Sequence, residues 1–228
     1  DKGLSELKDE LTYNVEILHA NAVKIKIGDP NSGLANDMKR VEAARIAIGD
    51  EIDLMVDANC ALSLKEALAF SKELSNYNVY WFEEPLPIHD YEGHSQLKKQ
   101  STINIATGEN GYHLEHFKNL SKHDCASIYN VDVAICAGYD VALEISDLAA
   151  TNNISISPHG CQELQLPLVA GIENGEFLEY YPKEVDPLRS EMFEPILKPD
   201  KDGYVTVPEK PGLGYDLNIN LLKKYQVI

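Results

Sequence analysis

Short apolar runs alternate with longer amphipathic segments along most of the chain. The runs predict buried strands at 23–28, 53–59, 79–85, 103–109, 126–134, 154–160 and 176–181. The amphipathic stretches predict helices at 3–19, 36–48, 63–76, 112–122, 138–151 and 162–171. Ser63, followed three residues later by Glu66, is typical of a capping box at the start of one helix. Strands that alternate with helices in this way predict a parallel α/β sheet.

The number of strands favours a TIM-like barrel that is incomplete. Seven strands are predicted, whereas a closed barrel needs eight, so we expect the first barrel strand to lie upstream of Asp1. An open, doubly wound sheet is the rival architecture, but neither G-x-G-x-x-G nor a P-loop follows the first strand. The alternation stops near Tyr181, where Pro, Lys and Asp become frequent. We therefore expect a partial (β/α) barrel over 1–180 and a C-terminal wrapping segment over 181–228.

Polar and ionisable residues stand where almost every predicted strand ends. Successive strand ends lie 20 to 31 residues apart, which is about the length of one β/α unit. The carboxyl ends of barrel strands meet at one mouth, where active sites of such barrels are found. The sequence therefore predicts that one group of side chains converges there: Lys24, Lys26, Asp57, Asn59, Glu83, Glu84, Glu109, Asn110, Asp132, His159 and Glu179.

Three carboxylates of this group follow consecutive strands: Asp57, Glu83 and Glu109. No arginine neighbours them in the sequence, so they would repel one another unless a cation held them together. Carboxylate oxygens with open positions for water and substrate suit Mg²⁺ better than Zn²⁺. Each acid taken alone is explained equally well as a surface residue at the start of a loop. Their matched spacing favours the metal site.

The other residues of the group suggest acid–base chemistry. Lys24 and Lys26 alternate along one strand and so share a face, where we expect each ammonium to lower the pKa of the other. A solvent-facing edge strand is the alternative for this pair. Asp132 and His159 follow neighbouring strands, and a carboxylate bonded to an imidazole fixes its tautomer. Glu179 interrupts an apolar strand and needs a hydrogen-bond partner there.

Composition narrows the class of partner. Lys and Arg number 20 and Asp and Glu 37, and the resulting charge of −17 disfavours nucleic acid and anionic membranes as partners. No apolar run of about 18 residues could span a bilayer. Four cysteines without C-x-x-C spacing and the lack of a visible secretory signal favour free thiols in the cytoplasm. The other histidines are expected to face solvent: His19, His89, His94, His113, His116 and His123. Of these, only His113, four residues after Glu109, could reach the mouth.

Several sequence fragments together resemble the mandelate racemase subgroup of the enolase superfamily. They are VKIKIGD, DANCALS, WFEEPL, ATGEN, the series Asp132, His159 and Glu179, and VPEKPGLGYDL near the end. The resemblance covers essentially the whole chain. It implies a modified (β/α)₇β barrel with an α+β capping domain, and both that cap and the first barrel strand are expected to be missing from this sequence.

The resemblance also implies a role for each site residue. Mg²⁺ would bind Asp57, Glu83 and Glu109, while Asn59 and Asn110 would line the substrate site. Acid–base chemistry would come from Lys26, tuned by Lys24, on one face of the substrate and from His159, oriented by Asp132, on the other. Glu179 would hydrogen-bond the substrate carboxylate or its enolate. The muconate-lactonizing branch has a lysine on its sixth strand, and NVDVAIC contains none, which favours the racemase-like branch.

The fragments GENGYHLEHF and ISPHG resemble acid-sugar dehydratases within this subgroup. The expected activity is a Mg²⁺-dependent hydro-lyase acting on an aldonate or aldarate. It would remove the α-proton, pass through an enediolate and yield a 2-keto-3-deoxy acid. A racemase or epimerase using the same residues is one alternative, and a catalytically idle barrel that binds metal or a partner is the other. Lys26 and His159 could exchange roles, and a homo-oligomer is expected by analogy.

Overall fold

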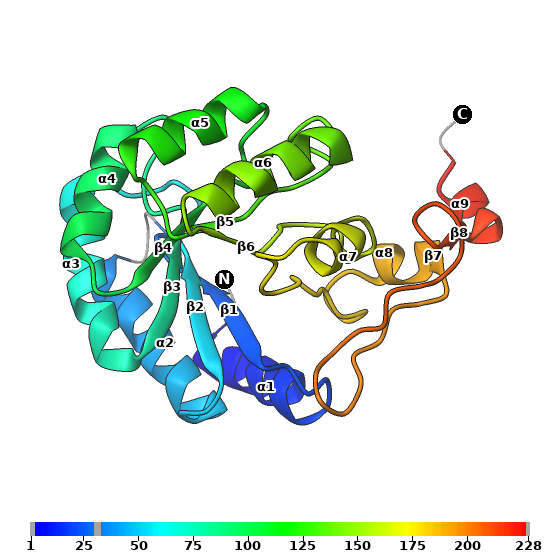
Figure 1. Ribbon diagram of the computed structural model, residues 1–228. Helices are drawn as coiled ribbons and strands as arrows, with labels where there is room; N and C mark the ends of the chain where they lie inside the picture. Colours follow the sequence, from blue (N-terminus) through cyan, green and yellow to red (C-terminus); the bar gives the residue numbers. More distant parts are fainter. Residues whose placement is uncertain (1–2, 30–32, 227–228) are drawn as a thin grey trace.

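The computed structural model describes residues 3–29 and 33–226 (Figure 1). Its main sheet has six strands, all parallel and paired in sequence order from β1 to β6. A doubly wound sheet would reverse its strand order part-way, so the sequential order rules out that rival architecture. The strands are β1 (Ala22–Lys26), β2 (Asp53–Asp57), β3 (Val79–Glu83), β4 (Asn104–Thr107), β5 (Ile128–Tyr129) and β6 (Ser155–Ile156).

Helices follow the strands and cover the outer, convex face of the curved sheet (Figure 1). The fold is thus the α/β barrel type that the sequence pattern predicts. No helix among the described residues is long and apolar enough to cross a membrane. The helices of this layer are α1 (Leu4–Glu16), α2 (Leu34–Ile48), α3 (Leu64–Leu74), α4 (Tyr91–Gln100), α5 (Leu114–His123), α6 (Tyr139–Thr151) and α7 (Gln162–Gly171), with a 3₁₀ turn, η1 (Ser75–Tyr77).

Two elements differ from the prediction. Helix α4 was not expected, because its sequence YEGHSQLKKQ is mostly polar; its fully buried face consists of few residues, among them Leu97 and His94. The segment 176–181 was expected to be a strand but is irregular. One parallel bridge, between Ile156 and Gly175, joins this region to β6: the Ile156 N–H donates to the Asn174 carbonyl at 2.8 Å, and the Glu176 N–H donates to the Ile156 carbonyl at 2.9 Å. Within the described residues this single bridge does not extend into a ladder.

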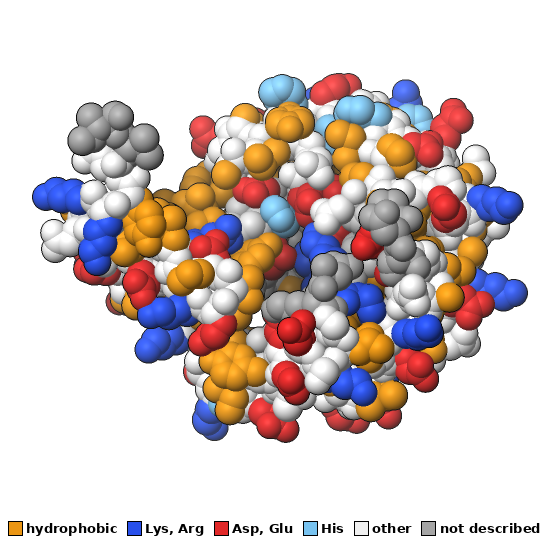
Figure 2. Space-filling model, turned by 180° about the vertical axis from the view of Figure 1, so that it is seen from behind, with side chains coloured by type: hydrophobic (Ala, Val, Ile, Leu, Met, Phe, Trp, Pro, Cys, Tyr) orange, Lys and Arg blue, Asp and Glu red, His pale blue; other side chains and the backbone are white. Residues whose placement is uncertain are grey.

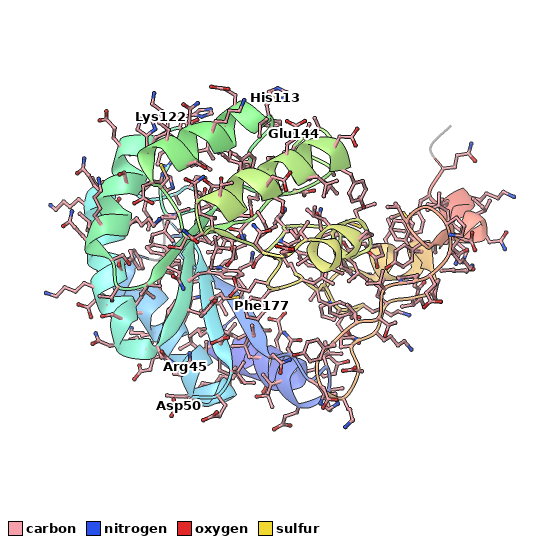
Figure 3. All side chains as sticks on the ribbon, in the orientation of Figure 1. Arg45, Asp50, His113, Lys122, Glu144 and Phe177 are labelled. Atoms are coloured by element: carbon pink, nitrogen blue, oxygen red, sulfur yellow. The ribbon has the colours of Figure 1, made fainter. Side chains whose placement is uncertain are left out.

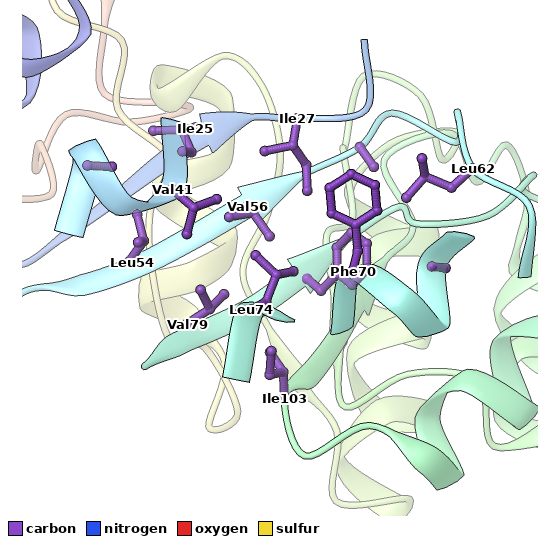
Figure 4. Packing of buried hydrophobic residues seen from close by; sticks show 14 of the residues in the cluster. Ile25, Ile27, Val41, Leu54, Val56, Leu62, Phe70, Leu74, Val79 and Ile103 are labelled. Atoms are coloured by element: carbon purple, nitrogen blue, oxygen red, sulfur yellow. The ribbon is translucent and has the colours of Figure 1, made fainter. Parts of the chain in front are cut away.

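Alternation along the strands separates two apolar layers. Outward-facing side chains such as Leu54, Val56 and Phe82 pack against the helices in the largest core cluster (Figure 4). Inward-facing Met55, Trp81, Ala106 and Ile128 form a smaller cluster inside the barrel. Phe177 (Figure 3) joins this inner cluster, and the centroid of its ring lies 6.0 Å from that of the Trp81 ring. The inner cluster forms the floor beneath the carboxyl ends of the strands.

Strand register brings the polar residues to one level above that floor. Lys26 pairs with Asp57, and Asp57 pairs with Glu83, so three strand ends meet side by side. Each of these residues stands two positions after an inward-facing one, and side chains two apart share a face of a strand. The register therefore orients them into the barrel, as the sequence spacing predicts.

Short elements after residue 181 project from the barrel (Figure 1), while residues 199–205 return to it, where the Asn21 side-chain amide donates to the Asp202 carbonyl at 2.9 Å. The short elements are α8 (Pro187–Met192), β7 (Phe193–Glu194), β8 (Asp216–Leu217) and α9 (Ile219–Lys224), with β7 and β8 antiparallel. Hydrophobic side chains gather on this projection (Figure 2), and Ile196, Leu217 and Ile219 are each about half exposed. The division at residues 180 and 181 remains a prediction, and its outer ends, 1–2 and 227–228, lie outside the described residues.

Candidate active site

The three carboxylates predicted to hold a metal converge in the structure. Asp57 ends β2, Glu83 ends β3 and Glu109 follows β4. All three are buried, and each offers one oxygen such that these oxygens lie within 4.8 Å of one another. Carboxylates this close and this buried repel one another strongly unless cations neutralise them. The spatial trio inferred from the sequence is therefore present.

The donor set fits a hard divalent cation. Oε2 of Glu109 is buried and has no hydrogen-bond partner, so it has a free lone pair to offer. Its other oxygen accepts from the Asn59 side-chain amide at 3.2 Å, and Oδ1 of Asp57 accepts from the Asn59 N–H at 2.8 Å. Asn59 thus orients two of the three carboxylates, as a residue around a metal site does. An all-oxygen set of this kind suits Mg²⁺ or Ca²⁺.

The two lysines of β1 contact the carboxylates directly, which the sequence did not indicate. Lys24 Nζ lies 2.8 Å from Glu83 Oε1 and 2.9 Å from Glu179 Oε1, and Lys26 pairs with Asp57. The expectation that each ammonium lowers the pKa of its neighbour is wrong for Lys24. Burial would lower its pKa, but Glu83, Glu179 and Asp57 outweigh burial and raise the pKa well above its ordinary value. Lys24 is thus a fixed cation in this arrangement, whereas Lys26 is half exposed at the mouth.

The predicted histidine–carboxylate pair also forms. His159 Nδ1 lies 3.2 Å from Asp132 Oδ2, and His159 Nε2 lies 3.5 Å from Glu109 Oε2. Burial lowers the pKa of His159, but its hydrogen bond to Asp132 and the charges of Glu179 and Glu109 outweigh burial and raise the pKa. The imidazole thus joins the acid–base residues to the carboxylate trio.

The surroundings of residue 160 explain why a glycine follows His159. The backbone of Gly160 has φ 97°, and a Cβ at this position would lie 2.6 Å from Asp132 Oδ2. Its N–H donates to Glu179 Oε2 at 2.9 Å. Burial raises the pKa of Glu179, but Lys24, His159 and this N–H together lower it, so the carboxylate is held ionised. Gly160 therefore allows Asp132 and Glu179 to approach the same imidazole.

Asn110 takes a different partner from the trio. Its amide donates to both oxygens of Glu84, at 3.1 and 2.9 Å. Glu84 is completely buried, has φ 39° and also accepts from the Cys60 thiol at 3.1 Å. Burial and the charge of Glu109 raise the pKa of Glu84. A left-handed glutamate beside a site is a feature that sequence reasoning gives no means to foresee.

A cavity of about 770 Å³ opens between β1 and residues 175–182. Lys24, Lys26, His159 and Glu179 line it, so the acid–base residues are accessible from the cavity. Asn130, unremarked in the sequence, also lines it. Asn130 is buried with its Oδ1 unpaired, while its amide donates to the Ser157 carbonyl at 3.0 Å. Its place two residues before Asp132 in the predicted strand 126–134 was the signal available to find it.

The expectation that the remaining histidines face solvent is wrong for two of them. His94 is completely buried and His116 is 9% exposed. His94 belongs to the unexpected helix α4, and His116 belongs to α5. His116 Nδ1 bonds the Tyr91 hydroxyl at 3.0 Å. His113 is exposed and lies on the outer helical layer, away from the mouth (Figure 3).

Comparison with known proteins identifies the family. The family model described as "Enolase C-terminal domain-like" matches residues 6–220, which is nearly the whole chain. The chain belongs to this family. Its parallel α/β barrel and its carboxylate trio at the strand ends agree with the resemblance drawn from the sequence.

Curated relatives of this family member act on sugar acids and their derivatives. The chain is 33% identical over 213 residues to an L-talarate/galactarate dehydratase from Salmonella typhimurium, covering 92% of this chain and 52% of the relative. It is 31% identical over 206 residues to a 3,6-anhydro-alpha-L-galactonate cycloisomerase from Streptomyces coelicolor, covering 90% of this chain and 55% of the relative. The chain thus spans about half the length of these relatives.

A solved structure shows the same fold with a metal. The crystal structure of L-talarate dehydratase from Polaromonas sp. JS666, complexed with Mg and L-glucarate, superposes with a TM-score of 0.88 at 29% identity. The match covers 97% of this chain and 60% of that one. Magnesium is bound in this structural neighbour. In the present chain, the group that could bind it consists of Asp57, Glu83 and Glu109.

Proposed function

We propose that this chain carries the metal-binding and acid–base part of a Mg²⁺-dependent sugar-acid dehydratase, a carbon–oxygen lyase. The observation that carries the proposal is the contact between the two groups: the Asp132-bound imidazole of His159 lies 3.5 Å from Glu109 of the carboxylate trio. An acid–base group beside a cation site is what removal of a proton next to a carboxylate needs. The dehydratase among the relatives supports the same reaction class.

The overall reaction balances without any redox partner. A proton leaves C2 of a 2,3-dihydroxy acid, the hydroxyl leaves C3 as water after protonation, and the resulting enol becomes a 2-keto-3-deoxy acid. Mg²⁺, when bound to Asp57, Glu83 and Glu109, would supply Lewis-acid stabilisation of negative charge at the substrate carboxylate. Every other step falls to side chains of the chain itself.

Two side chains are candidates for the proton transfers. His159 is held by Asp132 with one ring nitrogen left available, and Lys26 lies at the mouth on β1. We propose that Lys26 removes the α-proton and that His159 delivers a proton to the leaving hydroxyl. For a substrate of the opposite configuration at C2, the two residues would exchange these roles. Lys24 stays charged between Glu83 and Glu179 and orients both. Glu179, Asn59 and Asn110 are proposed to contact the substrate or the groups that bind it.

The test is a product assay in D₂O. The protein with Mg²⁺ is incubated with a panel of aldonic and aldaric acids, and NMR follows the C2 proton and any 2-keto product. The proposal expects a 2-keto-3-deoxy acid from one or two acids, and loss of that product in His159→Asn. Deuterium exchange or inversion at C2 without a keto product would contradict the dehydratase proposal and indicate a racemase or epimerase. An isomeric cyclic product would contradict it and indicate a cycloisomerase. Binding of Mg²⁺ with no reaction on any acid would contradict it.

The remaining properties are part of the same proposal. A small carboxylate is the expected substrate, and we propose a cytoplasmic homo-oligomer that binds neither nucleic acid nor membrane. The net charge of −17 supports the exclusion of anionic partners. Sedimentation equilibrium of the purified protein tests the oligomer, and a single monomeric species would contradict it.

A further inference from the structure

We propose that Gln165 is a positioning residue for His159 and acts through Asp132. Gln165 lies on α7, is completely buried, and its Nε2 donates to Asp132 Oδ1 at 2.8 Å. It does not line the cavity, so it can influence chemistry there only through its neighbours. The inference rests on the proposed function for its catalytic meaning, but its geometric part stands on these contacts alone.

The two oxygens of Asp132 have separate partners. Oδ1 accepts from Gln165 Nε2 and from the Ala134 N–H, both at 2.8 Å. Two donors on one oxygen hold the plane of the carboxylate, because rotation would break both bonds. Oδ2 is then directed to Nδ1 of His159 at 3.2 Å. The position of the imidazole is thus set by donors on the far side of Asp132.

The orientation of the Gln165 amide is itself determined. Its Oε1 accepts from the Val133 N–H at 3.4 Å while its Nε2 faces Asp132. A flipped amide would set Oε1 against a carboxylate oxygen and NH₂ against an N–H, and both contacts would be repulsive. Gln165 therefore acts as a donor to Asp132 in only one arrangement, which keeps Asp132 an acceptor.

An accepting Asp132 selects one form of neutral His159. Its Oδ2 needs the proton on Nδ1, which leaves the lone pair on Nε2. Nε2 is the nitrogen that lies 3.5 Å from Glu109 Oε2, at the carboxylate trio. Gln165 thus helps to place the basic nitrogen of His159 at the site, through the two hydrogen bonds that link Gln165 to Asp132 and Asp132 to His159.

The direct experiment is ¹⁵N NMR of the His159 ring in Gln165→Met, at a pH where the imidazole is neutral. Methionine keeps the volume and removes the donor, so we expect the share of the Nε2–H tautomer to rise by about tenfold. Gln162→Met is the matched control. Gln162 lies on the same helix and is as deeply buried, but its side chain bonds the Tyr181 backbone instead of Asp132. An unchanged tautomer in a folded Gln165→Met protein would overturn the proposal.

A second variant covers the case in which Gln165→Met does not fold. Gln165→Leu also removes the amide that donates to Asp132 and adds no second carboxylate beside it, so the same change of tautomer is expected. A coupling between Gln165 and Asp132 is also expected: the tautomer change in Gln165→Met should vanish in the Asp132→Asn background. An equal change in both backgrounds would assign the effect to general loosening and overturn the proposal.

Activity separates this inference from the proposed function. On an acid that the enzyme converts, kcat should fall about tenfold in Gln165→Met while KM stays unchanged, because Gln165 touches no substrate surface. A changed tautomer in a protein that converts no sugar acid would contradict the proposed function and support the positioning role. Conversion of a sugar acid with an unchanged tautomer would support the function and overturn the positioning role.

Discussion

The two halves of the barrel are built differently. Strands β1 to β4 have four or five residues each and share the largest hydrophobic cluster, whereas β5 and β6 have two residues each. In the second half side chains replace the missing ladder: Asn174 bonds the Ile154 carbonyl at 3.0 Å, and Gln162 bonds the backbone of Tyr181. Two of the three metal candidates end strands of the regular half, and Asp132, His159 and Glu179 belong to the irregular one.

This division assigns a different requirement to each half. Metal ligands must converge to within a few ångströms, and continuous strand register provides that precision. Asp132, His159 and Glu179 lie outside the long strands and are held by bonds from Gln165 and Gly160, whereas Lys26 ends β1 of the regular half. We therefore expect strand-core mutations to act on global stability and side-chain mutations in the second half to act locally.

The largest effect is expected on metal binding by the regular half. Mg²⁺ should stabilise the protein saturably, by about 2.7 kcal/mol at a hundredfold excess over Kd. Glu83→Gln removes one charge of the trio and should weaken Mg²⁺ binding more than about 100-fold. Thermal unfolding during Mg²⁺ titration measures both. Glu51→Gln, at an exposed acid, is the control. An unchanged response in Glu83→Gln would remove the trio assignment.

The next largest effect concerns the core under the regular strands. Leu54 is completely buried between β2 and the helices, so Leu54→Ala should cost about 2–5 kcal/mol of unfolding free energy. Urea denaturation measures this, with Leu143→Ala on the exposed face of α6 as control. The His159 ring signals of the folded variant should stay unchanged. If they move, the two halves are not separable in the way the architecture suggests.

Sensitivity to acid is expected where the two halves meet, at His116 of α5, which bonds Tyr91 of α4. Burial, with His89 and His94 nearby, lowers the pKa of His116 from 6.5 to about 4. The unfolded state therefore binds more protons than the folded state between these values, and stability falls as pH decreases. From pH 7 to pH 5 the loss should be about 2 kcal/mol. Urea unfolding should show this slope flattened in His116→Gln and retained in His113→Gln; equal slopes would refute it.

A smaller, local effect is expected from the side-chain hydrogen bonds of Asn174. Asn174→Ala removes bonds to Ser146 and to the Ile154 carbonyl and should cost about 1–2 kcal/mol. Amide hydrogen exchange should accelerate over 175–181 before it does in β2. Asn152→Ala, which loses only exposed bonds, is the matched control. Uniform acceleration across both halves would show that Asn174 acts on the whole fold.

The smallest effect tests a local signal outside either site. The Ser63 hydroxyl accepts from the Glu66 N–H at 3.4 Å, and Glu66 bonds back to the Ser63 N–H at 2.9 Å, as the capping-box pattern predicts. Ser63→Ala should cost about 1 kcal/mol in urea unfolding. Ser63→Gly, a tolerated cap residue, should recover most of it. Equal losses in both variants would contradict this expectation.

Local patterns were sufficient for most of the fold. Periodicity located six of the seven predicted strands, although β5 and β6 end four to five residues earlier than predicted, and it placed the helices α5, α6 and α7 to within about two residues. It failed for α4, because only one stripe of a mostly polar sequence is buried there. It also overestimated 176–181, because the apolar run continues where strand partners do not.

The candidate site divides in the same way. Spacing alone indicated that Asp57, Glu83 and Glu109 meet, because parallel strands of similar length end at one edge. Spacing could not show that Lys24 neutralises Glu83, since a charge pair across two strands depends on side-chain reach. Nor could it distinguish Asn59, which bonds the trio, from Asn110, which bonds Glu84.

By itself, the sequence determined the parallel barrel, the family resemblance and the identity of the residues at the strand ends. The barrel and the strand-end residues follow from periodicity and spacing, which act over one β/α unit and need no knowledge of distant contacts, and the resemblance follows from the matching sequence fragments. Only the tertiary structure decided which group each polar residue contacts and how Gln165 holds Asp132. The physical reason is range: a hydrogen bond depends on tenths of an ångström between segments far apart in the chain, and only folded packing sets that distance.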